Sequence, residues 1–212
     1  MTISGKRTMA VVFAFIICGI SASHSVGQET PAWKTHAPVV IKYDGDMTAL
    51  LASLSSKYGA TIGLEVDPKQ PQPQVELYLK EATLTDILNA IVKSAPRYQW
   101  RESGGLIEVL PLEGTDPILD TGISGFRLDN VDDREAINQL VKLPEVQAAM
   151  RATSLDFRDL GNASTNRKGE KVSFNLESGT MRQALNRIAK ETGARFWIFR
   201  RDSNGFFSIS TP

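Results

Sequence analysis

The sequence predicts an α+β protein of two tandem small domains, each made of two β-α-β halves with helices packed on small sheets. The main observation is an internal repeat, because residues 75–100 recur without a gap as residues 172–197. A second observation is that both copies combine the two-residue apolar period of a strand with the period of a helix. Self-similarity of this kind indicates a duplicated structural unit.

Eight positions are identical between the two copies. They are Val75/Val172, Leu79/Leu176, Thr83/Thr180, Leu88/Leu185, Asn89/Asn186, Ile91/Ile188, Lys93/Lys190 and Trp100/Trp197. Each copy begins with three apolar residues two positions apart, the pattern of a strand with one buried face. A threonine then precedes Asp86 or Gln183 by three residues, which predicts a capping box at a helix start. An amphipathic helix and a strand hairpin complete each copy.

A unit of one helix and three short strands is too small to enclose a core. We therefore expect each copy to pack with a strand-helix-strand unit that lies upstream of it. In the first domain this unit is a strand at 39–43, a helix capped by Asp46 and ended by Gly59, and a strand at 61–64. In the second it is a strand at 123–128, a helix broken at Pro144, and a strand at 154–160.

These elements predict a first domain at residues 38–112 and a second at 122–212, each folding independently. Residues 113–121 contain three acidic residues and one proline, and we expect them to form a linker. Residues 1–27 have the basic, apolar and small-residue order of a signal peptide, and residues 28–37 are expected to be a flexible leader. The exported chain would be periplasmic, with no membrane span after cleavage.

At this point the pattern resembles a known family, the secretin and TonB short N-terminal domain. The matching stretches are SKYGATIGL, VELYLKEATLTDILNAIV and YQWRESGGLIEVL in the first domain, and the segment from Val172 onward in the second. The resemblance implies two periplasmic modules that contact an inner-membrane regulator or a secretion-machine component. We expect the two modules to stand without the secretin core or receptor barrel found in the family.

Catalytic and metal-binding chemistry finds little support in the residue types. Cys18 lies within the signal peptide, and His24 and His36 precede both predicted domains. A zinc site or a histidine-based triad is therefore not expected. The exported chain would have 22 basic and 24 acidic residues, so no strong field attracts nucleic acid. We expect no enzyme activity, no catalytic residues, no metal and no cofactor.

A candidate partner-binding site comes from the differences between the copies. Gln99 of the first copy is replaced by Phe196 in the second, and Arg101 is replaced by Ile198. With Arg200 and Phe206 on the same strand face, these residues have the composition of a binding hot spot. The alternative is that this face packs on the first domain or under the broken first helix of the second domain.

The predicted function is thus a periplasmic protein-protein interaction module, an accessory of an outer-membrane secretion or TonB-dependent signalling system. A periplasmic small-molecule or cell-wall-glycan binding protein is the alternative. Its discriminating property would be retention on peptidoglycan without any protein partner.

Overall fold

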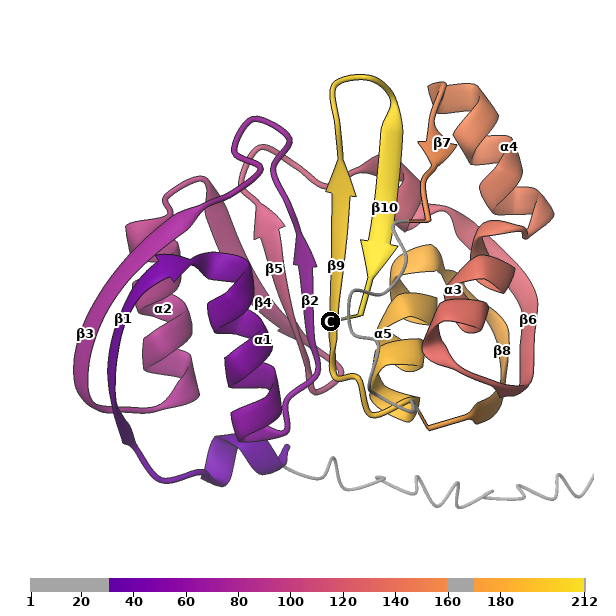
Figure 1. Ribbon diagram of the computed structural model, residues 1–212. Coiled ribbons are helices and arrows are strands. Elements are labelled where there is room, and N and C mark those ends of the chain that lie inside the picture. Colours follow the sequence, from indigo (N-terminus) through magenta and orange to yellow (C-terminus); the bar gives the residue numbers. More distant parts are fainter. Residues whose placement is uncertain (1–30, 160–169, 212) are drawn as a thin grey trace, which may run out of the picture.

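The protein has an α+β fold in which one mixed sheet connects two repeats (Figure 1). The computed structural model describes residues 31–159 and 170–211. We call residues 31–112 the first repeat and residues 113–211 the second repeat. The predicted signal peptide lies outside the described residues. Within these two ranges, no helix is long and apolar enough to cross a membrane.

The first repeat follows the predicted order of elements. In sequence these are η1 (Ala32–Thr35), β1 (Val39–Asp46), α1 (Met47–Tyr58), β2 (Ile62–Glu65), β3 (Gln74–Ala82), α2 (Leu84–Ser94), β4 (Tyr98–Ser103) and β5 (Leu106–Pro111). Asp46 caps α1 by accepting from the Ala49 N–H, and Thr83 with Asp86 forms the predicted capping box. Gly59 ends α1 in the left-handed conformation, with a φ of 64°. Local polar signals therefore identified the helix ends correctly.

The second repeat has the same order with an interrupted first helix. Its elements are η2 (Pro117–Asp120), β6 (Gly122–Val131), α3 (Asp133–Val141), α4 (Pro144–Thr153), β7 (Asp156–Phe157), β8 (Val172–Thr180), α5 (Met181–Glu191), β9 (Phe196–Arg201) and β10 (Phe206–Ser210). Pro144 starts α4, as expected from a residue that fits the first turn of a helix. The strand expected at 154–160 is much shorter than predicted, because only Asp156 and Phe157 pair with β10.

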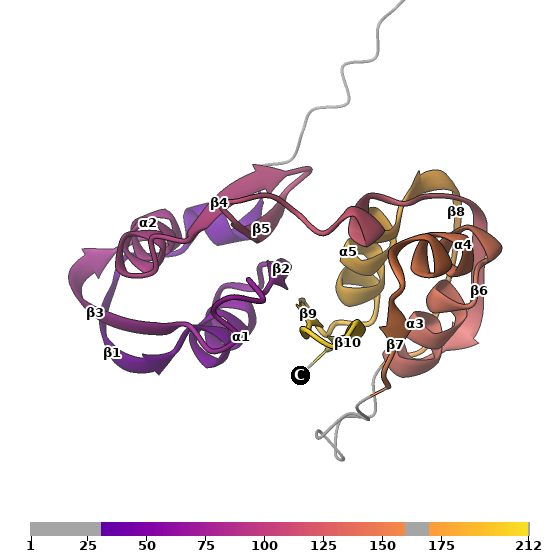
Figure 2. The same cartoon turned by 90° about the horizontal axis from the view of Figure 1, so that it is seen from above.

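The central sheet has six strands in the order β4-β5-β2-β9-β10-β7. β5, β2 and β9 run parallel to one another, whereas β4 and β10 run antiparallel to their neighbours β5 and β9. In each repeat the helices lie between this sheet and an outer two-stranded ribbon, β1–β3 or β6–β8 (Figures 1 and 2). The two repeats meet where β2 pairs with β9.

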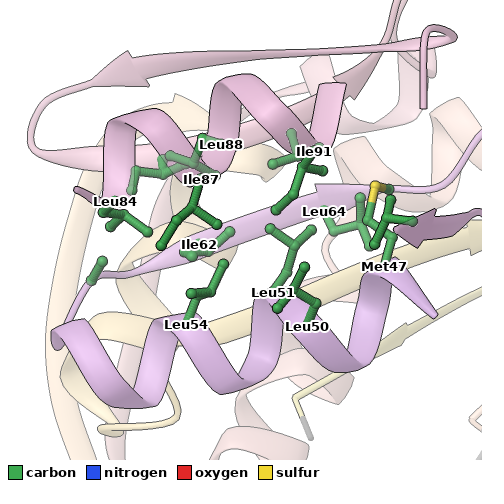
Figure 3. Packing of buried hydrophobic residues seen from close by; sticks show 14 of the residues in the cluster. Met47, Leu50, Leu51, Leu54, Ile62, Leu64, Leu84, Ile87, Leu88 and Ile91 are labelled. Carbon is green, nitrogen blue, oxygen red and sulfur yellow. The ribbon is translucent and has the colours of Figure 1, made fainter. Parts of the chain in front are cut away.

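Two cores flank this meeting point. In the first, side chains of α1 and α2 point toward one another around Ile62 and Leu64 of β2 (Figure 3). Phe196 and Ile198 of β9 also belong to the first core, whereas Trp197 and Phe199 belong to the second. Successive side chains of a strand point to opposite faces, so β9 contributes to both cores at once. Two independently folded domains are therefore not confirmed.

Two segments expected to be irregular contribute to the cores instead. In the predicted flexible leader, Trp33 is only 5% exposed and packs in the first core. In the predicted linker, Ile118 and Leu119 of η2 are fully buried in the second core. The acidic residues and the proline of the predicted linker suggested solvent exposure, but both segments also contain apolar side chains whose burial favours an ordered position.

Gly63 in the middle of β2 is required by the close approach of the second repeat. It pairs with Trp197 of β9, and a Cβ atom at Gly63 would lie 2.4 Å from the indole Cζ2 atom. Real Cβ atoms do not approach this closely, and the indole is fully buried, so it has no space to retreat.

We predict that Gly63→Ala lowers the free energy of unfolding by about 1–3 kcal/mol, the usual cost of overpacking a core. Urea denaturation of the protein measures this loss. The control is Gly122→Ala on β6, where an added Cβ would contact no atom within 4 Å. Equal urea midpoints for Gly63→Ala and the unmodified chain would contradict the proposed tight contact.

Candidate functional site

The predicted binding face is covered by the first repeat. Phe196 and Ile198 are each 1% exposed, so they do not form a surface hot spot. Arg200 lies on the same face, as predicted, but is half-buried, and its Nη2 is 3.4 Å from the Thr48 Oγ1 of α1. Burial lowers the pKa of Arg200. The alternative interpretation, in which this face packs on the first domain, describes the structure.

Phe206 lies on the same sheet face as the other three predicted site residues, but it does not belong to the first core. It lies on β10, is partly exposed, and has the Arg158 guanidinium 4.1 Å from its ring centroid. Strand parity assigned the face of Phe196, Ile198 and Arg200 correctly. Parity alone could not show which element covers that face, because the covering helix α1 lies more than 130 residues away in the chain.

The junction of the two repeats is formed by backbone pairing. The Ile62 N–H donates to the Arg195 carbonyl at 2.8 Å, and the Val66 N–H donates to the Phe199 carbonyl at 3.0 Å. Arg195 has a positive φ of 56°, which is uncommon for a bulky residue. Its carbonyl also accepts from the Ser55 Oγ at 2.8 Å, so contacts with the first repeat hold this strained residue.

A buried polar chain crosses the junction beside this backbone pairing. The Trp197 Nε1–H donates to the Asn186 Oδ1 at 2.7 Å, and the Asn186 Nδ2–H donates to Glu108 Oε1 of the first repeat at 3.1 Å. Asn186, Trp197 and Glu108 are all buried. Burying a polar group without a hydrogen-bond partner is unfavourable for folding. This series of hydrogen bonds therefore requires one relative position of the two repeats.

A buried ion pair lies at the other side of the junction. The Arg182 Nη2 is 2.9 Å from the Glu65 Oε2, and both side chains are at most 4% exposed. The Asp116 N–H donates to the second oxygen of Glu65, and Arg201 pairs with the Asp116 carboxylate at 3.0 Å. Burial raises the pKa of Glu65, and this effect outweighs the opposite effects of Arg182 and of the Asp116 N–H.

Two hollows lie at opposite ends of the paired strands. The one at the carboxyl ends has a volume of about 240 Å³, and its charged groups pair with one another, as Glu113 does with Lys69 at 2.7 Å. The one at the amino ends has a volume of about 560 Å³. Trp33 and glycines of the first repeat line it together with Lys190 and Arg195 of the second.

The first repeat retains the counterpart of the joined strand β9 at a free sheet edge. This counterpart is β4, the terminal strand of the sheet beside β5. The Trp100 Nε1–H donates to the Asn89 Oδ1 at 2.9 Å, which reproduces the Trp197–Asn186 bond 97 residues later. Trp100 is only partly buried, whereas Trp197 is fully buried, because no strand of the described residues lies on the outer side of β4.

The backbone of β4 is oriented like that of β9. In antiparallel pairs, hydrogen-bonded residue pairs alternate with pairs whose N–H and C=O groups point away from the partner strand. The Leu112 N–H donates to the Arg97 carbonyl, so the backbone groups of Tyr98, Trp100 and Glu102 point away from β5. These three residues correspond to the β9 residues that face β2. The edge of β4 can therefore accept a strand by the same geometry.

Sequence reasoning listed the Asn and Trp identities of the two copies but did not assign them to a binding edge. The available signal was the retention of an identical asparagine beside the apolar helical stripe, 11 residues before a tryptophan in both copies. Among the described residues, no group of three or more His, Cys, Asp or Glu side chains is arranged to hold a metal ion.

Comparisons with known proteins leave the family open. No family model matches the chain, and no curated protein and no solved structure matches it significantly. The resemblance to the secretin and TonB short N-terminal domain stays a prediction from the sequence pattern.

We predict that changing Phe196 to Gln and Ile198 to Arg together lowers the free energy of unfolding by more than about 4 kcal/mol, because both residues are core and a charge would be buried unpaired. Thermal and urea unfolding measure the loss. Phe206→Gln, on the partly exposed hairpin, serves as the control and should cost no more than about 1 kcal/mol. A folded double variant of nearly unchanged stability would show that this face is free in solution.

Proposed function

We propose that this protein is an exported periplasmic protein-protein interaction module without enzyme activity, an accessory of an outer-membrane secretion or TonB-dependent signalling system. The observation that carries the proposal is the free edge of β4. It has the backbone orientation and the Trp-Asn pair by which β9 binds another strand. The family resemblance of the sequence supports the same class of function.

Strand addition at a sheet edge is a common mode of protein recognition, because unpaired N–H and C=O groups bind an extended segment. Natural proteins protect such edges from unspecific pairing with charged or polar side chains. On β4 the exposed side chains of Gln99, Arg101 and Glu102 have this role. The edge is thus suited to a selective and reversible partner.

The ion pairing of the acidic residues at the junction supports the absence of enzyme activity. Glu65, Asp116 and Glu113 are each engaged by a basic partner, Arg182, Arg201 and Lys69 respectively.

A proline substitution at one position of β4 tests the proposal. Glu102→Pro removes an N–H from the free edge, and prolines are tolerated on edge strands. Glu102→Ala removes the same side chain but keeps the N–H. In a pull-down from periplasmic extract, we expect a discrete protein partner to be retained by the exported chain and by Glu102→Ala, and to be lost with Glu102→Pro. Equal capture by all three would exclude the β4 edge as the binding site.

The larger hollow supports a second candidate, a periplasmic small-molecule or cell-wall-glycan binding protein. Its volume of about 560 Å³ is in the range of ligand sites. Lys190 and Arg195 are its charged lining residues, and neither forms an ion pair with another described residue. An anionic group would find two positive charges there.

Retention on purified peptidoglycan tests this second candidate. If it is correct, the exported chain is retained and Lys190→Gln weakens retention several-fold, because one of the two positive charges is lost. Lys93→Gln changes the equivalent residue of the first repeat, which does not line the hollow, and should leave retention unchanged. Absence of retention, or an equal loss in both variants, would eliminate this candidate.

A further inference from the structure

We propose that β4 binds an extended segment of a separate partner protein that runs parallel to β4, with a glycine opposite Trp100 and an acidic residue opposite Arg101. This inference rests on the proposed function as a protein-binding module. It adds the direction, the register and the residue types that the partner segment must have.

The direction and register follow from the β2–β9 junction. β2 lies parallel to β9, with Ile62 opposite Phe196, Gly63 opposite Trp197 and Leu64 opposite Ile198. The repeat relation of 97 residues places Gln99, Trp100 and Arg101 at the corresponding positions of β4. A parallel strand beside β4 would meet the outward N–H and C=O groups of Trp100 and Glu102, as β2 meets those of β9.

The glycine requirement follows from the tryptophan. At the junction, the Trp197 ring lies so close to the backbone of β2 that a Cβ atom at Gly63 would be 2.4 Å from it. The bond from the indole N–H to the Asn amide fixes the ring position, and the same bond is present at Trp100 and Asn89. A strand beside β4 therefore meets a ring held in the same position, and only glycine leaves room for it.

The neighbouring positions of the partner follow from the two substitutions between the copies. The apolar Phe196 and Ile198 match the apolar Ile62 and Leu64 of β2, and all four side chains are buried. On β4 the corresponding residues are Gln99 and Arg101. The Arg101 side chain is 56% exposed, and it is the Nε–H that donates to the Glu108 Oε2 at 2.7 Å, so a partner carboxylate would meet the terminal Nη groups. A polar residue opposite Gln99 and a carboxylate opposite Arg101 are the complementary choices, because charge pairs across adjacent strands are favourable.

A separate partner is favoured over a second copy of this chain. The strand of the second repeat that corresponds to β2 is β7, which has only the two residues Asp156 and Phe157 and contains no glycine. It therefore does not present the glycine that the Trp100 position requires. The single strand edge also offers a small contact area, which is typical of a transient complex.

The test uses peptides derived from β2. The probe is residues 60–67 with Ile62→Thr and Leu64→Glu, that is ATTGEEVD, and its matched control is ATTVEEVD, in which valine replaces the glycine. Each is titrated into the ¹⁵N-labelled exported chain. We expect the glycine peptide to shift the Trp100 indole and the β4 amides, and to bind at least about tenfold more tightly than the valine peptide, because a Cβ would overpack the ring.

A charge exchange tests the second requirement. Arg101→Gln should weaken binding of the glycine peptide several-fold, and melting curves of the variant confirm that it remains folded. A peptide with glutamine in place of the glutamate opposite Arg101 should bind the unmodified chain and the Arg101→Gln variant equally.

Three results would overturn the inference. Equal affinity of the glycine and valine peptides, or no binding of either, would refute the register. The proposed function is tested separately. It would still be supported if capture of a natural partner were lost with Glu102→Pro, even when neither peptide result fits the proposed register. Self-association of the exported chain that Glu102→Pro abolishes would identify a second copy as the occupant instead of a separate protein.

Discussion

The parallel pairing of β2 with β9 is the contact on which the rest of the molecule depends. It joins two small sheets into one and places β9 between two cores, with alternate side chains in each. A repeat of this size buries little apolar surface by itself. By sharing β9, the first core gains Phe196 and Ile198, two large side chains that its own repeat does not supply.

Polar groups make this pairing specific. The Trp197–Asn186–Glu108 chain and the Glu65–Arg182 pair are buried, so a shifted register would leave several of these groups without partners. Buried ion pairs contribute little net stability against apolar replacements, because desolvation of both charges is costly. Their role here is better described as selection of one arrangement among the many that apolar surfaces would permit.

The duplicated strand has different surroundings in the two repeats, and its side chains follow them. β9 is an interior strand with Phe196 and Ile198 in a core, whereas β4 is an edge strand with Gln99 and Arg101 in solvent. The backbone orientation and the tryptophan–asparagine bond are kept in both. The structural capacity to accept a strand is thus retained in the first repeat, while its exposed side chains limit which strand can bind.

The sequence by itself determined the α+β class, the duplicated unit, most strands and helices, and the helix caps, because these depend on local periodicity and on polar groups three residues apart. The parity of β9 was also local, which is why Phe196, Ile198 and Arg200 were correctly assigned to one face. Only the tertiary structure decided that α1 covers this face, that Trp33 and η2 join the cores, and that β4 is the edge strand of the sheet among the described residues. These outcomes depend on contacts between residues far apart in the chain, and periodicity carries no information about the partner of an apolar face.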